Sequence, residues 1–259
     1  MEIIMKRIIA LVLCTVMLFA LASCGAKTIT SKDDLNNLNI GMIKNSKSTD
    51  TLSTYRTDNN CEFVKYATLP EIDNAFNLKD IDCAVLDRNV ANSFVADYAG
   101  YTVLEDSLGE GAVTFATTSK IYKIMLDKAL AALKENGTID SILNSYFKDK
   151  NYKYVPKELE NDNGEFVIAL DIALTPYCEN DGTYVNGGIA LSILDAICEY
   201  LGCNYTILPI TTAEITKAIK TGTADFALGD FITTTTNETN EIFETEPVIT
   251  FDYAIVTKK

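Results

Sequence analysis

The side chains that can do chemistry in this chain are carboxylates, hydroxyls and thiols, because histidine is absent. Without an imidazole the chain cannot form a Ser-His-Asp or Cys-His catalytic group, a histidine metal site or a histidine pH switch. The cysteines show no C-x-x-C spacing, so neither structural zinc nor a redox motif is expected. No nucleophile–base pair is evident either. These residue types favour a binding protein over an enzyme, and no metal or cofactor is expected.

The cysteines that follow position 24 are odd in number, so at least one thiol stays outside any disulfide or pairs between molecules. They are Cys61, Cys83, Cys178, Cys198 and Cys203. Cys198 and Cys203 are the nearest pair along the chain and could bridge a helix end to the following strand. Separate half-buried thiols are the alternative.

Acidic side chains outnumber basic ones, 36 against 22, which gives a net charge of -14. That sign repels nucleic acid and anionic lipid headgroups, so neither is expected to bind the folded part of the chain. The chain has 259 residues, of which 47% are apolar. This is enough to bury a core, in one large domain or two small ones.

The first segment, 1–23, has the pattern of a secretory signal peptide. Lys6 and Arg7 form a basic head, and the uncharged run from Ile8 to Leu21 is short for a membrane span but suits a signal peptide. The following Leu-Ala-Ser-Cys24 resembles the bacterial lipobox, which implies cleavage before Cys24 and lipidation of its thiol. Two lipid chains would anchor the mature protein outside the cell membrane. An ordinary signal peptide or membrane anchor, with Cys24 incidental, is the alternative.

Beyond residue 38, apolar runs of strand length alternate with segments of helical period, and a charged segment at 148–164 interrupts them as a linker. Such alternation predicts an α/β fold of two Rossmann-like lobes, each a largely parallel sheet covered by helices, with ligands at the carboxyl ends of strands. The expected strands are 39–43, 62–66, 82–86, 112–116, 166–170, 204–208, 225–228 and 249–257. The expected helices are 48–56, 119–136, 138–147, 188–201, 213–220 and 236–243.

The segment 166–259 resembles the first lobe of type II solute-binding proteins of ABC importers, in the polar amino-acid branch. The motifs that carry the resemblance are a strand ending at Asp171 with Pro176-Tyr177 after it, Gly187-Gly188 before a helix, the G-x-x-D turn of 222–225, the threonine-rich turn 233–236, and Glu246-Pro247. The resemblance implies a periplasmic-binding-protein fold of type II, with two lobes and a hinge.

The segment 30–150 resembles the second lobe of the same family and its closing helices. Asp82 to Ala91 is similar to the family's D-A-V-x-x-D-R-x-V-A segment, and Asn136 to Ile139 lies in a stretch similar to its closing G-T-x-x-x-I motif. Because lobe two precedes lobe one, the lobe order is that of a circular permutation, which a polar linker makes feasible. A gene fragment spanning two tandem copies is the alternative. The predicted division is 1–23 signal peptide, 24–37 tether and entry to lobe two, 38–111 lobe two, 112–148 hinge strand and closing helices, 149–164 linker, and 165–259 lobe one.

In this family an amino-acid ligand lies between the lobes: an Arg and helix-start N–H groups hold its carboxylate, Asp side chains its ammonium, and aromatic rings its side chain. By resemblance, Asp87 occupies the position of an ammonium-binding Asp; its alternative role is a helix cap near Asn89. Ser46, Lys47 and Ser48 fall where the family binds the carboxylate, or else form a solvated helix cap. The implied ligand-binding positions are Ser46, Lys47, Ser48, Asp87, Asp171, Leu174, Tyr177, Thr212, Gly229, Asp230, Phe231, Thr234 and Asn237.

Lobe one departs from the family pattern at several of these positions. No Arg lies in 233–240, where Asn237 is nearest its place, and Leu174 and Thr212 stand at the aromatic positions. Gly229-Asp230 replaces a pair of small hydroxyl residues, although Phe231 could supply a ring. Loss of the guanidinium removes a geometrically specific anion anchor. The pocket is therefore expected to favour a small polar or cationic nitrogenous solute.

The expected function is capture of such a solute outside the cell, by lobe closure, for delivery to an ABC permease. A degenerate lobe pair that serves as a sensor or docking lipoprotein is the first alternative. A periplasmic dehydratase-like enzyme, with a carboxylate as general acid or base, is the second.

Overall fold

The computed structural model describes residues 28–148, 163–180, 185–231 and 241–259. The chain divides into two units, Met1–Thr30 and Ser31–Lys259, and both lobes belong to the second. The predicted signal peptide, Cys24, linker residues 149–162, Thr234 and Asn237 lie outside the described residues. In the described stretches, no helix combines the length and apolar character needed to cross a membrane.

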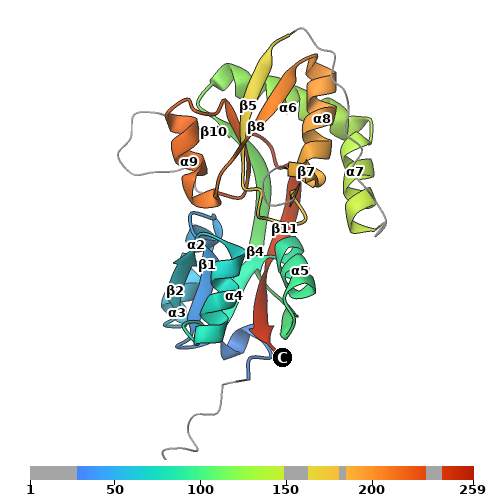
Figure 1. The fold of residues 1–259 in the computed structure, drawn as a ribbon. Coiled ribbons are helices and arrows are strands. Elements are labelled where there is room, and N and C mark those ends of the chain that lie inside the picture. The colour runs from blue at the N-terminus through green and yellow to red at the C-terminus, as the bar shows by residue number, and fades with distance from the viewer. Residues whose placement is uncertain (1–27, 149–162, 181–184, 232–240) are drawn as a thin grey trace, which may run out of the picture. The chain divides into compact units, whose positions relative to one another are not determined.

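Lobe two is built on a five-stranded sheet in the order β2-β1-β3-β11-β4 (Figure 1). β1 pairs in parallel with β2 and β3, whereas β11 runs antiparallel to both β3 and β4. The burial of β3 on every residue reflects its central place and its apolar sequence. The bounds are β1 Asn39–Ile43, β2 Glu62–Tyr66, β3 Cys83–Asp87, β4 Tyr101–Thr117 and β11 Ile249–Lys258.

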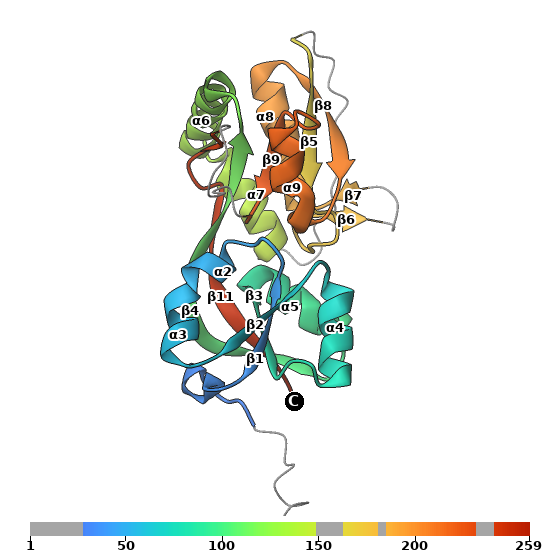
Figure 2. The same cartoon turned by 90° about the vertical axis from the view of Figure 1, so that its left-hand side faces the viewer.

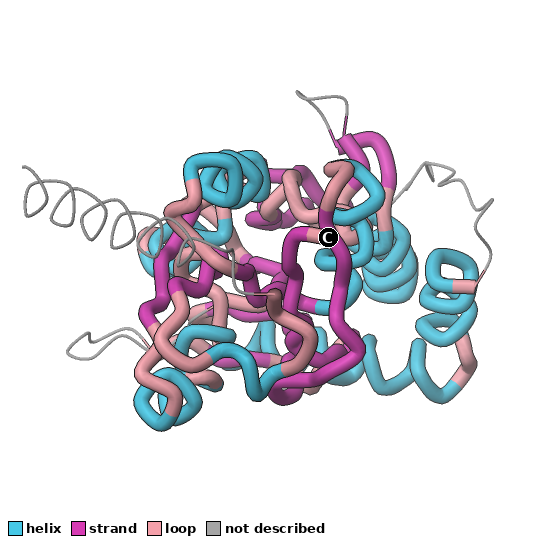
Figure 3. Tube along the Cα trace, turned by 90° about the horizontal axis from the view of Figure 1, so that it is seen from below, coloured by secondary structure: helices cyan, strands magenta, loops and turns pink. Residues whose placement is uncertain are grey.

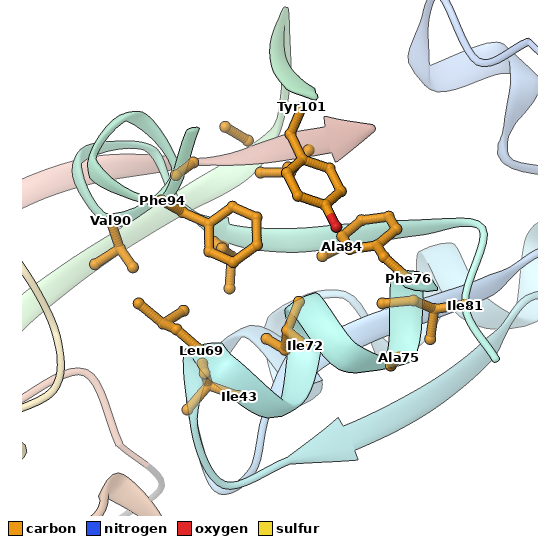
Figure 4. Close-up of a cluster of buried hydrophobic side chains, with 14 residues drawn as sticks. Ile43, Leu69, Ile72, Ala75, Phe76, Ile81, Ala84, Val90, Phe94 and Tyr101 are labelled. Carbon is orange, nitrogen blue, oxygen red and sulfur yellow. The ribbon is translucent and has the colours of Figure 1, made fainter. Parts of the chain in front are cut away.

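Two helices cover the core of lobe two, α4 (Leu69–Leu78) and α5 (Arg88–Asp97). Figure 4 shows Ile72 and Phe76 of α4 gathered with Phe94 of α5 in one cluster of buried side chains. The ring of Tyr101 lies 4.8 Å from that of Phe76 and 5.2 Å from that of Phe94, centroid to centroid. These rings and aliphatic side chains hold both helices against the sheet. The remaining elements of this lobe are the 3₁₀ helix η1 (Lys32–Leu35), α2 (Ser48–Thr51) and α3 (Ser53–Asp58).

Lobe one is built on a second sheet, in the order β8-β5-β9-β4, with β10 on the other side of β4. β5 pairs in parallel with β8 and β9, and β4 runs antiparallel to β9. The bounds are β5 Glu165–Leu170, β8 Asn204–Pro209, β9 Phe226–Gly229 and β10 Phe243–Glu244; a short hairpin adds β6 Glu179–Asn180 and β7 Val185–Gly187. The helices are α6 Lys120–Glu135, α7 Thr138–Phe147, α8 Ile189–Leu201 and α9 Thr212–Lys220. Helices α6 and α7 pack on α8. Seen from below, most helices of the molecule lie around its strands (Figure 3).

Two strands connect the lobes. β4 pairs with β11 through Tyr101 to Val113 and with β9 through Thr114 to Ala116, so it belongs to both sheets. Figure 2 shows β4 and β11 running between the two sets of elements. The sequence-based division assigned all of 165–259 to lobe one, but β11 lies in the sheet of lobe two, between β3 and β4. The largely buried strand β11 fills the position between β3 and β4 in the sheet of lobe two.

The predicted fold class, α/β with two lobes, is confirmed by these sheets. Several details differ from the predicted elements. The strand expected over 112–116 is the end of a longer strand, β4. The helix expected over 48–56 breaks at Leu52 into α2 and α3. Of the helix expected over 236–243, residues 236–240 lie outside the described residues, and the prediction is wrong at its end, because Phe243 starts β10. The β6–β7 hairpin was not predicted. Cys198 and Cys203 are thiols that hydrogen-bond to each other, and the described cysteines form no disulfide.

Candidate functional site

A pocket between the lobes collects residues from both sheets. Its cavity is about 60 Å³, room for a few water-sized groups. The walls are mostly aliphatic, with polar groups at a few points, as is usual for small-molecule sites. The lining residues are Ile43, Ser46, Ser48, Val85, Leu86, Asp87, Val90, Val113, Leu170, Asp171, Leu174, Tyr177, Cys178, Ile189, Ala190, Ile193, Thr212, Ile215, Leu228, Gly229, Asp230 and Ile249.

Asp87 enters the pocket from lobe two, where β3 ends and α5 begins. Its Oδ1 accepts a hydrogen bond of 2.7 Å from the backbone N–H of Asn89, so the carboxylate caps α5. Its Oδ2 accepts from the hydroxyl of Tyr177, which belongs to lobe one and also accepts from Asn89 Nδ2 at 3.2 Å. Burial raises the pKa of Asp87 to about 7, against the lowering effect of these hydrogen bonds. Asp87 therefore serves as a helix cap and as a contact between the lobes.

Asp230 enters from lobe one, directly after β9. Its Oδ2 accepts from Ser46 Oγ of lobe two at 2.7 Å and from the hydroxyl of Tyr253 on β11 at 3.1 Å. Loss of water around the carboxylate raises its pKa to about 6, although the Ser46 hydrogen bond and the charge of Lys47 oppose the shift. Ser46 and Tyr253 both reach Asp230 through hydroxyl groups.

Asp171, at the end of β5, has a different set of partners. Its Oδ2 accepts from both the backbone N–H and the hydroxyl of Thr212 at 2.7 Å, and its Oδ1 accepts from the backbone N–H of Ala173 at 3.1 Å. Burial raises its pKa above the ordinary value. Two of its three donors are fixed backbone groups, so this carboxylate holds the start of α9 in place.

Nine of the positions implied by the family resemblance line this pocket: Ser46, Ser48, Asp87, Asp171, Leu174, Tyr177, Thr212, Gly229 and Asp230. Two others do not. Lys47 forms an ion pair with Glu244 of β10, and Glu244 also accepts from Thr114 Oγ1 at 3.1 Å. Phe231 is 1% exposed and packs in the core of lobe one, so its ring is not on the pocket wall.

Sequence reasoning missed Tyr253 and Asn89, which hydrogen-bond to pocket groups. Tyr253 lies within an apolar strand, and the only local signal for a polar role was its hydroxyl. Asn89 follows a helix-capping residue, where an amide side chain is ordinary. Sequence reasoning also missed the aliphatic walls from α8 and β3, because buried core residues carry the same pattern.

The charge of the pocket is one-sided. Three aspartates line it, and no Lys or Arg does so among the described residues. In the same part of the chain no group of three Cys, Asp or Glu side chains is arranged to hold a metal ion. The arrangement is suited to bind a positively charged group inside an aliphatic cavity.

No protein-family model matches the sequence, and no curated protein matches it either. Several solved structures are similar in fold. One is the GluR0 ligand-binding core in complex with L-glutamate, at 11% identity over 86% of this chain and 85% of that chain, with a TM-score of 0.43. Another is the probable amino-acid ABC transporter extracellular-binding protein ytmK from Bacillus subtilis, at 8% identity, 87% and 85% coverage, and a TM-score of 0.42. A third is the reduced OxyR regulatory domain from Pseudomonas aeruginosa, at 10% identity, 86% and 89% coverage, and a TM-score of 0.43.

Proposed function

We propose that this protein is an extracytoplasmic solute-binding protein of an ABC importer, which captures a small polar or cationic, amino-acid-like solute between its lobes. The observation that carries the proposal is the pocket itself. Asp87 of lobe two and Asp230 of lobe one reach the same aliphatic cavity from opposite sides. A solute that contacts both carboxylates is held best when the lobes are together, so binding favours the closed arrangement.

The route of delivery follows from the leader sequence. Removal of 1–23 would expose Cys24 for lipidation, and two acyl chains would keep the protein at the outer side of the cell membrane. There it would release solute to a permease in the same membrane. Replacement of Cys24 by Ala (C24A) should move the protein from the membrane fraction to the soluble fraction. A protein that stays in the membrane fraction after this change would contradict the lipid anchor.

No reaction is proposed for the pocket. The role of Asp87 and Asp230 is to bind the solute, and each of them accepts a hydrogen bond from a hydroxyl group. One observation favours a second function, that of a sensor or docking lipoprotein without transport. The hydroxyls of Tyr177 and Ser46 reach across the lobe boundary to Asp87 and Asp230, so groups of the chain itself link the two lobes.

Thermal unfolding of the purified protein with a panel of amino acids, amines, diamines and other polar solutes tests the proposal. A true solute at about 100 times its Kd should stabilise the protein by about 2.7 kcal/mol. Stabilisation by at least one small solute is the expected result. If the whole panel leaves the midpoint unchanged, transport is excluded in favour of the docking function. Chemical conversion of a panel member would instead indicate an enzyme.

A further inference from the structure

In the described part of the chain, N–H groups at the helix starts beside the pocket donate to groups of the chain itself. Helix N-termini attract anions because their first N–H groups lack partners within the helix. Among the described residues, three helices of eight residues or more begin at this pocket, namely α5, α8 and α9, and in each of them at least one N–H group of the first turn donates to an acceptor within the chain. The acceptors of these N–H groups show which kinds of ligand group the helix starts can bind.

At α5 and α9 the acceptors are carboxylates. Asn89 N–H donates to Asp87 at 2.7 Å, and Thr212 N–H donates to Asp171 at 2.7 Å. The protein thus places its own anions at both helix starts. A ligand carboxylate would have to displace a buried carboxylate and lie beside its negative charge, which is unfavourable in a cavity with aliphatic walls.

At α8 the acceptors are backbone carbonyls. Ile189 N–H donates to the carbonyl oxygen of Pro176 at 3.3 Å, and Ala190 N–H donates to that of Tyr177 at 2.9 Å. Ile189 and Ala190 line the pocket. The short α2 segment repeats the pattern, because Ser48 N–H donates to Ser46 Oγ at 3.1 Å. Lys47, whose charge acts on Asp230, forms an ion pair with Glu244.

Asp87 and Asp230 differ from Asp171 in a way that suits a cation. Asp87 accepts from the hydroxyl of Tyr177, and Asp230 accepts from the hydroxyls of Ser46 and Tyr253. A hydroxyl can rotate and accept a hydrogen bond as well as donate one. When an ammonium group enters, these hydroxyls can become acceptors for its N–H groups while both carboxylates contact its charge. The two carboxylates also repel each other: the charge of Asp230 contributes to the raised pKa of Asp87.

We infer that the solute is a small organic amine without a carboxylate, and that its single ammonium group binds between Asp87 of lobe two and Asp230 of lobe one. The inference rests on the proposed function, because it names the class of solute that the same pocket captures. The aliphatic walls, among them Val85, Ile193 and Leu228, would surround the hydrocarbon part. Asp171 positions α9 and does not contact the ammonium.

Isothermal titration with a matched set of probes tests the inference. The set is n-butylamine, norvaline and n-butanol, with their propyl and pentyl counterparts; norvaline is butylamine with a carboxylate on the carbon that bears nitrogen, and butanol lacks the charge. We expect the best amine to bind at least about tenfold more tightly than the matched amino acid or alcohol, a difference of about 1.4 kcal/mol.

The variants Asp87→Asn and Asp230→Asn should each weaken amine binding at least about tenfold, because each removes one charge that contacts the ammonium. Asparagine keeps the shape, and the hydroxyl partners can reverse their hydrogen bonds, so circular dichroism and thermal unfolding should show folded proteins. Glu135→Gln is the matched control, since Glu135 is exposed on α6, and it should bind the amine like the parent.

Two results would overturn the inference and leave the proposed function standing. One is tighter binding of an amino acid than of its matched amine. The other is unchanged amine affinity in both Asn variants. If no member of the set and no member of the wider panel binds, the proposed function fails and the inference fails with it.

Discussion

Each lobe places an aspartate at the carboxyl end of a strand beside the pocket, and the two carboxylates are used differently. In lobe one, Asp171 accepts from two backbone N–H groups and one hydroxyl. In lobe two, Asp87 accepts from the backbone N–H groups of Asn89 and Val90 and from the hydroxyl of Tyr177, which reaches it from the other lobe. The direction of a backbone N–H is fixed and that of a hydroxyl is not. The hydroxyl on Asp171 comes from its own lobe, whereas that on Asp87 comes from the other lobe, so only Asp87 can exchange its hydroxyl partner for a solute when the lobes separate.

The largest expected effect is that of Asp171→Asn on stability. An amide has one acceptor oxygen, so its NH₂ group must face either Thr212 N–H or Ala173 N–H, and one buried donor loses its acceptor. We expect a loss of about 2–3 kcal/mol in the free energy of unfolding, measured by urea denaturation. Thr212→Val is the matched control, because it removes only the hydroxyl donor and should cost about 1 kcal/mol. Equal stability of D171N and the parent would contradict the comparison.

For Asp87→Asn we expect a gain in the free energy of unfolding of the protein without solute, the opposite of the loss expected for Asp171→Asn. The raised pKa, about 7, means that the folded state disfavours the charged carboxylate. The stability contributed by the neutral carboxyl is present at pH 4 and is lost as the pH rises through 7. Asparagine does not ionise and caps helices as well as aspartate does. D87N should therefore be more stable than the parent by roughly 1–2 kcal/mol at pH 8 and nearly equal to it at pH 4.

Thermal unfolding at the two pH values measures this difference, and a stabilisation that is the same at both would show that the charge of Asp87 is not its source. Asp230→Asn should follow the same pattern, with its change complete once the pH has risen through about 6.

Solute affinity should depend on pH in the corresponding way. Asp87, with a pKa of about 7, faces Tyr177 and Asp230; Asp230, with a pKa of about 6, faces Tyr253 and is close to Lys47 and Glu244. An ammonium group stays charged from pH 8 to pH 5, whereas both carboxylates gain protons as the pH falls through this range. Amine affinity should fall by about tenfold or more between pH 8 and pH 5, as titration calorimetry would measure. Affinity that is constant over this interval would argue against both carboxylates as contacts.

The smallest effect is expected for Lys47→Met. Lys47 pairs with Glu244 and its side chain is 27% exposed, so the pair contributes little to stability, on the order of 0.5 kcal/mol. Because Lys47 is not on the pocket wall, amine affinity in K47M should stay within about threefold of the parent. Glu244→Gln is the complementary variant and should behave alike. A large gain or loss of affinity in K47M alone would place Lys47 beside the solute.

The sequence predicted those parts of the molecule that depend on local pattern. Apolar runs separated by helical segments identified the strands at whose carboxyl ends Asp87 and Asp171 lie. A carboxylate after a buried strand is placed at the correct edge of its sheet by topology alone. The alternative role of Asp87 as a helix cap was also visible locally, since it precedes the first turn of α5.

The remaining features depend on contacts between distant segments. The pairing of Lys47 with Glu244 depends on β10, which the sequence pattern assigned to the end of a helix. Phe231 follows β9 directly, and an aromatic ring at that position suits a pocket wall or a core equally well. The hydroxyl of Tyr177 meets Asp87 only because the two lobes are in contact. Local propensity carries no information about such pairs.

The position of β11 has a consequence for how the protein is made. Lobe two contains the earlier segments of the chain, yet its sheet needs β11 between β3 and β4, where Tyr253 is paired with Asp87. During synthesis this lobe would leave the ribosome with an open sheet edge and would stay incomplete until residues 249–258 had been added. Long-range strand pairing of this kind is slow, so the nascent chain would remain unfolded for longer. A chain that is to be threaded through a membrane before it folds would benefit from that delay.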